Sequence, residues 1–124
     1  MAIAGGARGL GFWPGHWPTG SAHAINAVAR DVARVGPAVY SPNLPATSDQ
    51  GELLLSARSS GGALYVIAIN PTYHAIDATM HQSLLGGRTL TVLGESRKIR
   101  SVNDAFGDSF APLAVHIYYA GPSE

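Results

Sequence analysis

Aromatic side chains gather near the N-terminus in a short segment rich in glycine and proline. Both tryptophans of the chain, Trp13 and Trp17, stand there on either side of His16. Aromatic rings stack on the apolar C–H faces of sugar rings, and a Gly/Pro loop is not where a core normally places tryptophan. These three residues are therefore the candidate sugar contacts. The alternative, in which both tryptophans pack as a plug at a domain interface, stays open.

Carboxylates are the second set of residues that could do chemistry. Glycoside hydrolysis uses two carboxyl groups, about 5 Å apart in retaining enzymes and about 6.5–9.5 Å apart in inverting ones. Glu95 and Asp104, both in predicted turns, are the candidate catalytic pair, completed across a subunit boundary. The alternative is that Glu95, Asp104 and Asp108 only serve the turns of the fold.

Other catalytic chemistries find little support in the sequence. Five histidines are present, but none pair as His-x-His or His-x-x-x-His, so we expect no metal. His116 is expected to be a hydrogen-bonded histidine within a strand. The chain has no cysteine, no Gly-x-Ser-x-Gly elbow and no strand-to-helix Gly-x-Gly-x-x-Gly fingerprint. We therefore expect no cofactor and no bound nucleotide.

Charge is scarce along the whole chain. Eight Lys+Arg balance eight Asp+Glu, and charged residues are 13% of the 124 residues, against about 25% in a typical soluble domain. This balance predicts no binding to nucleic acid or to a membrane. The sequence contains no run of about 18 apolar residues, so we expect no membrane span. The start of the chain lacks the pattern of a signal peptide, so we expect a cytoplasmic protein. Because so little charge protects the surface, we also expect a homo-oligomer.

One amphipathic helix is predicted over residues 21–35. Apolar residues recur there at spacings of three and four, which places them in one stripe. Ser21 is expected to cap the start of the helix, whereas Gly36 and Pro37 end it. Before the helix, residues 8–13 predict a short strand that runs into a Pro/Gly loop.

The remaining chain predicts a β-sandwich. Residues 37–51 contain three prolines and predict a loop or linker, so we place a domain boundary between units of residues 1–50 and 51–124. Short apolar or alternating runs in the second unit, separated by Gly/Asn/Asp turns, are typical of an antiparallel sandwich. The predicted strands are residues 52–58, 63–70, 75–80, 88–93, 98–102, 109–110 and 113–119. The fold class is mainly β, with one N-terminal α-helix and a short Gly/Trp-rich N-terminal strand or loop.

Two predicted strands are apolar on both faces. In residues 63–70, the side chains of Leu64 and Val66 alternate with those of Tyr65 and Ile67, and the last strand shows the same pattern. A sandwich strand with one face in solvent carries polar residues on that face. We therefore expect another layer on this outer face, formed by the N-terminal helix, another domain or another subunit.

Three segments of the second unit carry a pattern of a known family. They read Gly62-Ala-Leu-Tyr-Val-Ile-Ala-Ile-Asn70-Pro-Thr, Arg88-Thr-Leu-Thr-Val-Leu-Gly-Glu-Ser-Arg97 and Phe106-Gly-Asp-Ser-Phe-Ala-Pro-Leu-Ala-Val-His-Ile-Tyr118. In this order they resemble the C-terminal β-sandwich that follows the (β/α)8 barrel in many glycoside hydrolases. The resemblance covers about the last 75 residues and implies a carbohydrate-related module with a sandwich fold.

The residues before the sandwich resemble the end of such a barrel. Residues 6–13 are similar to the last barrel strand, whose final aromatic lines a sugar subsite in such enzymes. Residues 21–35 resemble the final barrel helix, and residues 37–41 resemble the link into the sandwich. Seven of the eight barrel units have no counterpart in the sequence, and the paired catalytic carboxylates belong to those units. The resemblance therefore carries over no catalytic acid or nucleophile.

Three functions follow as hypotheses. The first is a carbohydrate-active module derived from a glycoside hydrolase, which associates with itself and contacts sugar. The second is a small stand-alone glycosidase, an O-glycosyl hydrolase whose active site is completed at an oligomer interface. The third is a lectin-like module that binds sugar without chemistry. The sequence leaves open whether the chain is an enzyme.

Overall fold

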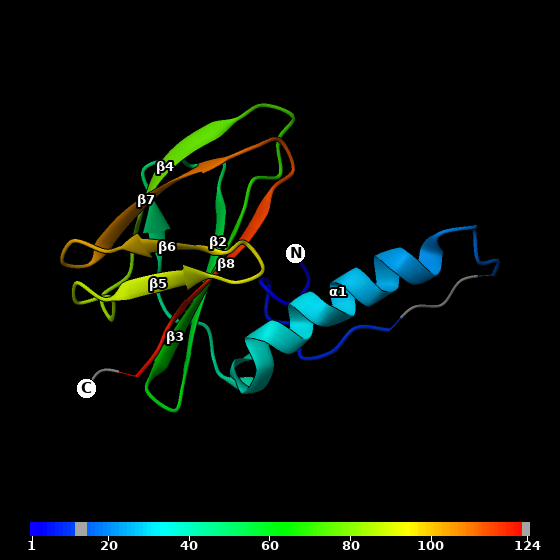
Figure 1. The fold of residues 1–124 in the computed structure, drawn as a ribbon, viewed down its shortest axis with the longest axis horizontal. Coiled ribbons are helices and arrows are strands. Elements are labelled where there is room, and N and C mark those ends of the chain that lie inside the picture. Colours follow the sequence, from blue (N-terminus) through cyan, green and yellow to red (C-terminus); the bar gives the residue numbers. More distant parts are fainter. Residues whose placement is uncertain (12–14, 123–124) are drawn as a thin grey trace.

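The fold is a helical segment beside a two-sheet sandwich (Figure 1). The computed structural model describes residues 1–11 and 15–122. Helix α1 covers Ser21–Val35, and the 3-10 helix η1 follows directly over Gly36–Tyr40. The strands are β1 (Thr47–Ser48), β2 (Leu54–Ser60), β3 (Ala63–Ile69), β4 (Ile76–His81), β5 (Thr89–Val92), β6 (Arg97–Arg100), β7 (Ala105–Phe110) and β8 (Val115–Ala120). The predicted mainly β fold with one N-terminal α-helix is confirmed for the described part of the chain.

Two antiparallel sheets build the sandwich. The larger sheet has the strand order β2-β3-β8-β5-β6, and the smaller has the order β1-β4-β7. In the larger sheet β3 pairs with both β2 and β8, which places the two-faced apolar strands in its interior. Strands β6 and β7 are edges of different sheets and contact each other, so they close one side of the sandwich.

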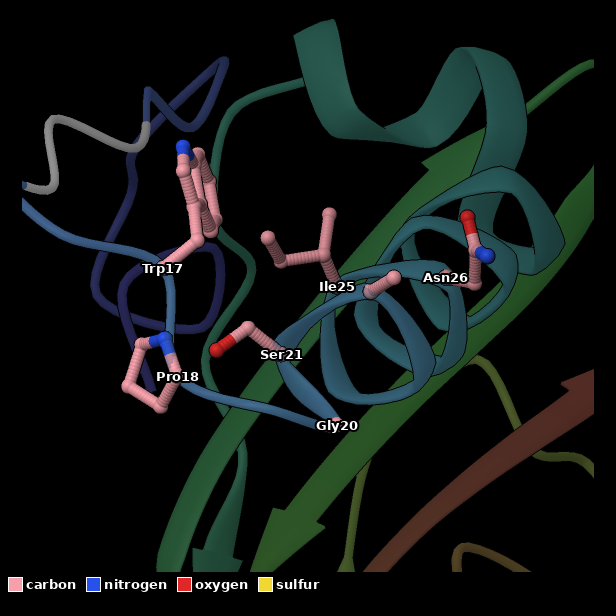
Figure 2. A pocket seen from close by; sticks show the side chains of 7 residues that line it. Trp17, Pro18, Gly20, Ser21, Ile25 and Asn26 are labelled. Atoms are coloured by element: carbon pink, nitrogen blue, oxygen red, sulfur yellow. The ribbon is translucent and has the colours of Figure 1, made fainter.

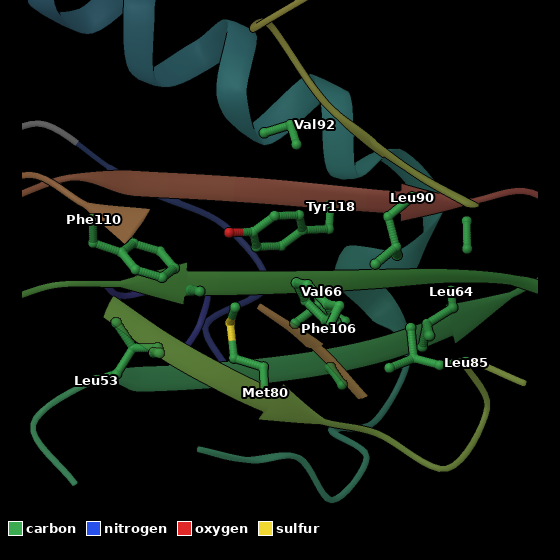
Figure 3. Close-up of a cluster of buried hydrophobic side chains, with 14 of the residues drawn as sticks. Leu53, Leu64, Val66, Met80, Leu85, Leu90, Val92, Phe106, Phe110 and Tyr118 are labelled. Atoms are coloured by element: carbon green, nitrogen blue, oxygen red, sulfur yellow. The ribbon is translucent and has the colours of Figure 1, made fainter. Parts of the chain in front are cut away.

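The main core lies between the two sheets (Figure 3). In each of the strands β3, β5, β7 and β8, every second side chain points into this core. The rings of Phe106 and Tyr118 meet edge to face, with their centroids 4.7 Å apart. The largest fully buried apolar side chains here are Leu64, Met80, Leu85, Leu90, Phe110 and Tyr118.

The outer face of β3 and β8 carries a second apolar cluster. Ile67 and Ile69 of β3 and Ile117 of β8 point away from the main core and are buried. The prediction of another layer on this face is confirmed, because the chain's own N-terminal segment covers these isoleucines. The covering residues are Ile3, Val35, Ala38 and Val39.

Only one end of helix α1 packs on the sandwich. Val35 at its C-terminal end is buried, whereas the rest of the helix extends away from the sheet (Figure 1). At about 1.5 Å per residue its 15 residues span about 22 Å, which is longer than the part of the sheet that it meets. The predicted apolar stripe is therefore partly open, and Val28 in its middle is 38% exposed.

Local expectations around the helix need two corrections. Ser21 does not cap the helix: Gly20 precedes it with a left-handed φ of 91°, and no side chain bonds the free N–H groups there. Glycine adopts this backbone without steric cost, which explains why it ends the Pro/Gly segment. Residues 8–11 form no strand, and residues 12–13 of the predicted strand lie outside the described residues.

Residues 37–51 are more structured than a linker. The first of them, residues 37–40, form part of η1, because Ala38 and Val39 are apolar and pack in the cluster on the outer face of β3 and β8. Further on, Leu44 forms a β-bridge with Ala57 of β2, and β1 pairs with β4. Strand pairing thus starts before residue 50, while the division of the chain into two domains stays a prediction.

Candidate functional site

A cleft lies where the N-terminal segment turns into helix α1 (Figure 2). Pro18 fixes the backbone, and its carbonyl accepts a hydrogen bond from the Ser21 N–H at 3.1 Å, which closes a tight turn. This turn brings Trp17 beside the first two turns of the helix. The cleft has a volume of about 430 Å³ and is lined by Trp17, Pro18, Gly20, Ser21, Ala22, Ile25 and Asn26.

The walls of this cleft are mainly apolar, with two polar side chains among them. Trp17 and Ile25 come from different sides of the cleft, and 52% of Trp17 is exposed. The Ser21 hydroxyl and the Asn26 amide supply hydrogen-bonding groups at its border. An exposed indole next to a few polar groups is an arrangement that can hold a sugar ring.

The predicted sugar contacts lie in or beside this part of the chain. Trp17 lines the cleft, and His16, directly before it, is exposed to solvent. Trp13 lies outside the described residues. The sequence did not single out Asn26 or Ser21 as sugar contacts, because a helix surface normally carries such residues without a ligand.

A polar network closes the sandwich where β6 and β7 meet. Asp108 of β7 faces inward between Phe106 and Phe110, and its side chain is only 9% exposed. Both of its carboxylate oxygens accept hydrogen bonds from Arg97, at 2.8 and 2.7 Å, in a bidentate pair. The buried Tyr118 hydroxyl donates to the same carboxylate at 2.6 Å.

The network continues into the turn between β5 and β6. The Nε atom of Arg97 donates to one oxygen of Glu95 at 2.8 Å. The other oxygen of Glu95 is hydrogen-bonded to Nδ1 of His116 on β8. The prediction that His116 is a hydrogen-bonded strand histidine is confirmed. Arg97 thus joins two carboxylates that come from different sheets.

The network keeps both carboxyl groups ionised. Burial raises the pKa of Asp108, but hydrogen bonds from Arg97 and Tyr118 outweigh it, so the pKa lies below its ordinary value. The pKa of Glu95 is lowered in the same way, because hydrogen bonds from Arg97 and His116 outweigh its burial. Burial and the neighbouring Asp108 raise the pKa of Tyr118 far above its ordinary value. No carboxyl group here has the raised pKa of a general acid, so the geometry fits a structural closure of the core.

Glu95 and Asp104 do not meet within one chain. Glu95 precedes β6 and Asp104 follows it, so four strand residues, about 13 Å long, lie between the two turns. Asp104 is exposed. A pair formed by these residues across a subunit boundary stays a prediction.

Asp108 lies in a strand and not in a turn, which corrects the expectation for it. Strand β7 begins at Ala105, four residues before the predicted start at residue 109. Alternation with two phenylalanines places the carboxylate on the inner face. That alternation is the signal in the sequence that could have revealed an inward charge in need of a partner.

Within residues 1–11 and 15–122, no three His, Cys, Asp or Glu side chains form a group that could hold a metal ion. Over the same residues, no helix has both the length and the apolar character that a membrane crossing requires.

No protein-family model and no curated protein matches the chain, but several solved structures do. An α-amylase from Anoxybacillus matches with a TM-score of 0.65 and 20% identity over 82% of this chain. AmyP, solved in complex with maltose, matches with a TM-score of 0.65 and 9% identity over 88% of this chain. The glycoside hydrolase family 30 subfamily 8 xylanase Xyn30A from Clostridium acetobutylicum matches with a TM-score of 0.50 and 20% identity over 63% of it.

These comparisons show a shared fold. In all three cases the chain spans 23% of the length of the matched structure. Residues 47–124 are less than two thirds of this chain, so a match over 82% also includes residues before β1. The similarity to the α-amylase therefore extends beyond the sandwich into the N-terminal helical part.

Proposed function

We propose that the chain is a carbohydrate-active module of the glycoside-hydrolase type, in which the sandwich supports helix α1 and the segment before the helix contacts sugar. The observation that carries this proposal is the cleft beside α1, where Trp17 is 52% exposed among Pro18, Ile25 and Asn26. A chain that needed this indole for its core would bury it. The fold similarity to the α-amylase, AmyP and the xylanase supports a carbohydrate context.

The proposed ligand is an oligosaccharide that stacks on the indole of Trp17. The apolar C–H face of a sugar ring would lie on the indole, and its hydroxyls would reach the Asn26 amide and the Ser21 hydroxyl. AmyP was solved with maltose and maltotriose, and Xyn30A is a xylanase, so α-glucan and xylan fragments are the first ligands to test.

Isothermal titration with maltotriose and xylotriose tests the sugar contact. We expect one of the two to bind, and the Trp17→Ala variant to bind it at least about fivefold more weakly, the loss expected for about 1 kcal/mol of stacking. Tyr73→Ala is the matched control, because Tyr73 is 87% exposed in the turn after β3. Equal affinity of both variants would contradict the assignment of Trp17.

We further propose that the module associates with itself through its open apolar surface. Leu10, Val28 and Val115 are 42%, 38% and 48% exposed, and they line one groove between α1 and the outer face of β3 and β8. A formal net charge of zero gives two copies no net repulsion. A second copy that covered this groove would remove the exposed apolar area from water.

Light scattering on two charge variants tests self-association. Val28→Asp places a carboxylate in the apolar stripe and the groove, whereas Ala33→Asp places the same charge on an exposed face of the helix outside that groove. We expect an oligomer for the parent chain and for Ala33→Asp, and a monomer for Val28→Asp. A parent chain that is monomeric at micromolar concentration would overturn this part of the proposal.

The alternative function is a small glycosidase completed at an oligomer interface. The observation in its favour is that Glu95 is ionised and 31% exposed, as a nucleophile would be. Chromogenic glycosides test it, together with Glu95→Gln and Asp104→Asn. Turnover that either substitution abolishes would support the enzyme. Sugar binding without turnover would support the lectin-like module.

A further inference from the structure

Arg58 is a buried cation whose hydrogen-bond partners are backbone carbonyls. It lies in β2 on the outer face of the larger sheet, opposite Tyr65, and is only 2% exposed. No described carboxylate forms an ion pair with it. Its guanidinium donates hydrogen bonds to backbone carbonyls of Ile3 and Val39, and it lies 3.4 Å from the carbonyl of Ser41. Its Nε atom has no hydrogen-bond partner among the described residues.

Such a site is stable only if the carbonyls are held in place. A buried charge costs several kcal/mol unless hydrogen bonds replace its hydration. Val39 and Ser41 belong to the C-terminal end of η1, where carbonyls have no partner within the helix and carry partial negative charge. The guanidinium therefore complements this helix end. It also fixes the position of the end relative to β2.

Arg58 joins the sandwich to the two segments that form the base of helix α1. One is the turn of residues 1–7, which contributes the Ile3 carbonyl. The other is η1, which begins at the residue where α1 ends. On the far side of the base, the guanidinium of Arg34 lies against Gly94 in the turn after β5. Among the described residues, only the side chain of Arg58 is hydrogen-bonded to both segments of this base.

Because helix α1 is long, a small rotation at its base displaces its far end by a large distance. The helix is about 22 Å long, and Trp17 lies at its distant end, so a rotation of about 10° at the base moves that end by about 4 Å. A change at Arg58 is therefore expected to move the N-terminal end of α1 and Trp17 most, although neither contacts Arg58.

We propose that Arg58 is a positioning residue that sets the direction of α1 relative to the sandwich and thereby places Trp17. The meaning of this placement for sugar binding rests on the proposed function. The direction of the helix does not, so the two can be tested separately.

Spin-label distance measurements test the proposal on the intact chain. The protein has no cysteine, so Ala27→Cys on the helix and Ser83→Cys in the turn after β4 would carry the only two labels. We expect one narrow distance distribution for the parent and for the control Arg100→Met, which removes an exposed cation. In Arg58→Met the distribution should broaden or shift by several Å, and Arg58→Lys should partly restore it.

Two results would overturn the proposal. One is an unchanged narrow distribution in Arg58→Met. The other is loss of the sandwich in both Arg58 variants, seen as loss of the near-UV circular dichroism of the packed aromatic side chains, because Arg58 would then support the sheet instead of the helix. A distance change without sugar binding by the parent would leave this inference standing and would refute the proposed function.

Discussion

Replacing Arg97 by Met should weaken the whole sandwich, because it leaves the carboxylate of Asp108 without its main partner. The two side chains form a bidentate pair with N–O distances of 2.8 and 2.7 Å. The carboxylate side chain is 9% exposed, whereas that of Arg97 is 36% exposed. The pair therefore lies between the limits of a buried and a surface ion pair.

The magnitude follows from these exposures. Removing one partner of a fully buried pair costs about 3–5 kcal/mol, and a surface pair contributes about 0–1 kcal/mol. Water can reach the Arg97 side, and Asp108 keeps its bonds from the Tyr118 hydroxyl and the Ser109 N–H. We therefore expect Arg97→Met to lower the free energy of unfolding by about 2–3 kcal/mol. For a chain of this size that corresponds to a fall of roughly 10 °C in Tm.

A double-mutant cycle with Asp108→Asn isolates the interaction. Urea unfolding of the parent, both single variants and the double variant should give a coupling energy of about 1.5 kcal/mol or more. The exposed pair of His74 and Glu52 is the control, with both side chains 61% exposed, and its cycle should give a coupling near zero. Additive effects at Arg97 and Asp108, within about 0.5 kcal/mol, would refute the reasoning.

Three further predictions concern the same network and the turn beside it. Tyr118→Phe removes the donor to Asp108 and should cost about 1–2 kcal/mol in urea unfolding. Lowering the pH should destabilise the fold, because the pKa values of Glu95 and Asp108 are lower in the folded chain than in the unfolded chain. The stability that these two carboxylates contribute is complete above about pH 5 and is lost as the pH falls through their folded-state pKa values. In Arg97→Met this loss of stability with pH should be smaller. Gly94→Ala should lower Tm more than Gly86→Ala, because the φ of Gly94, 85°, lies beyond the left-handed range of about 50–70° that alanine can adopt, whereas the φ of Gly86 is 51°. The Arg34 guanidinium beside Gly94 is the end of a flexible side chain and can move away from the added Cβ.

Elements with a strong periodic pattern could be predicted from the sequence. The helix begins and ends at Ser21 and Val35 as predicted, because spacings of three and four coincide there with Gly36 as a stop. Strands β3 and β8 could be predicted because they carry apolar residues on both faces. The lack of polar residues on their outer face also predicted the layer that covers it. The short 3-10 helix η1 was missed, because three prolines nearby masked its two apolar anchors.

The polar sites could not be predicted to the same extent, since each depends on residues distant in the chain. Arg58 becomes buried only when residues from the first turn and from η1 fold over β2, and no local pattern contains that information. Asp108 meets Arg97 because the edges of two different sheets come together. Trp17 was identified by its residue type and its place in a Gly/Pro segment, and the structure adds the cleft beside it.

The most direct test of the proposed function is an NMR titration of the 15N-labelled chain with maltotriose and, separately, xylotriose. A Trp13→Phe variant identifies the indole N–H signal of Trp17. We predict that one sugar moves this signal and the side-chain amide of Asn26 together, in a saturable way, while the strand signals of the sandwich stay in place. Shifts confined to the sandwich, or no shift with either sugar at millimolar concentration, would contradict the account.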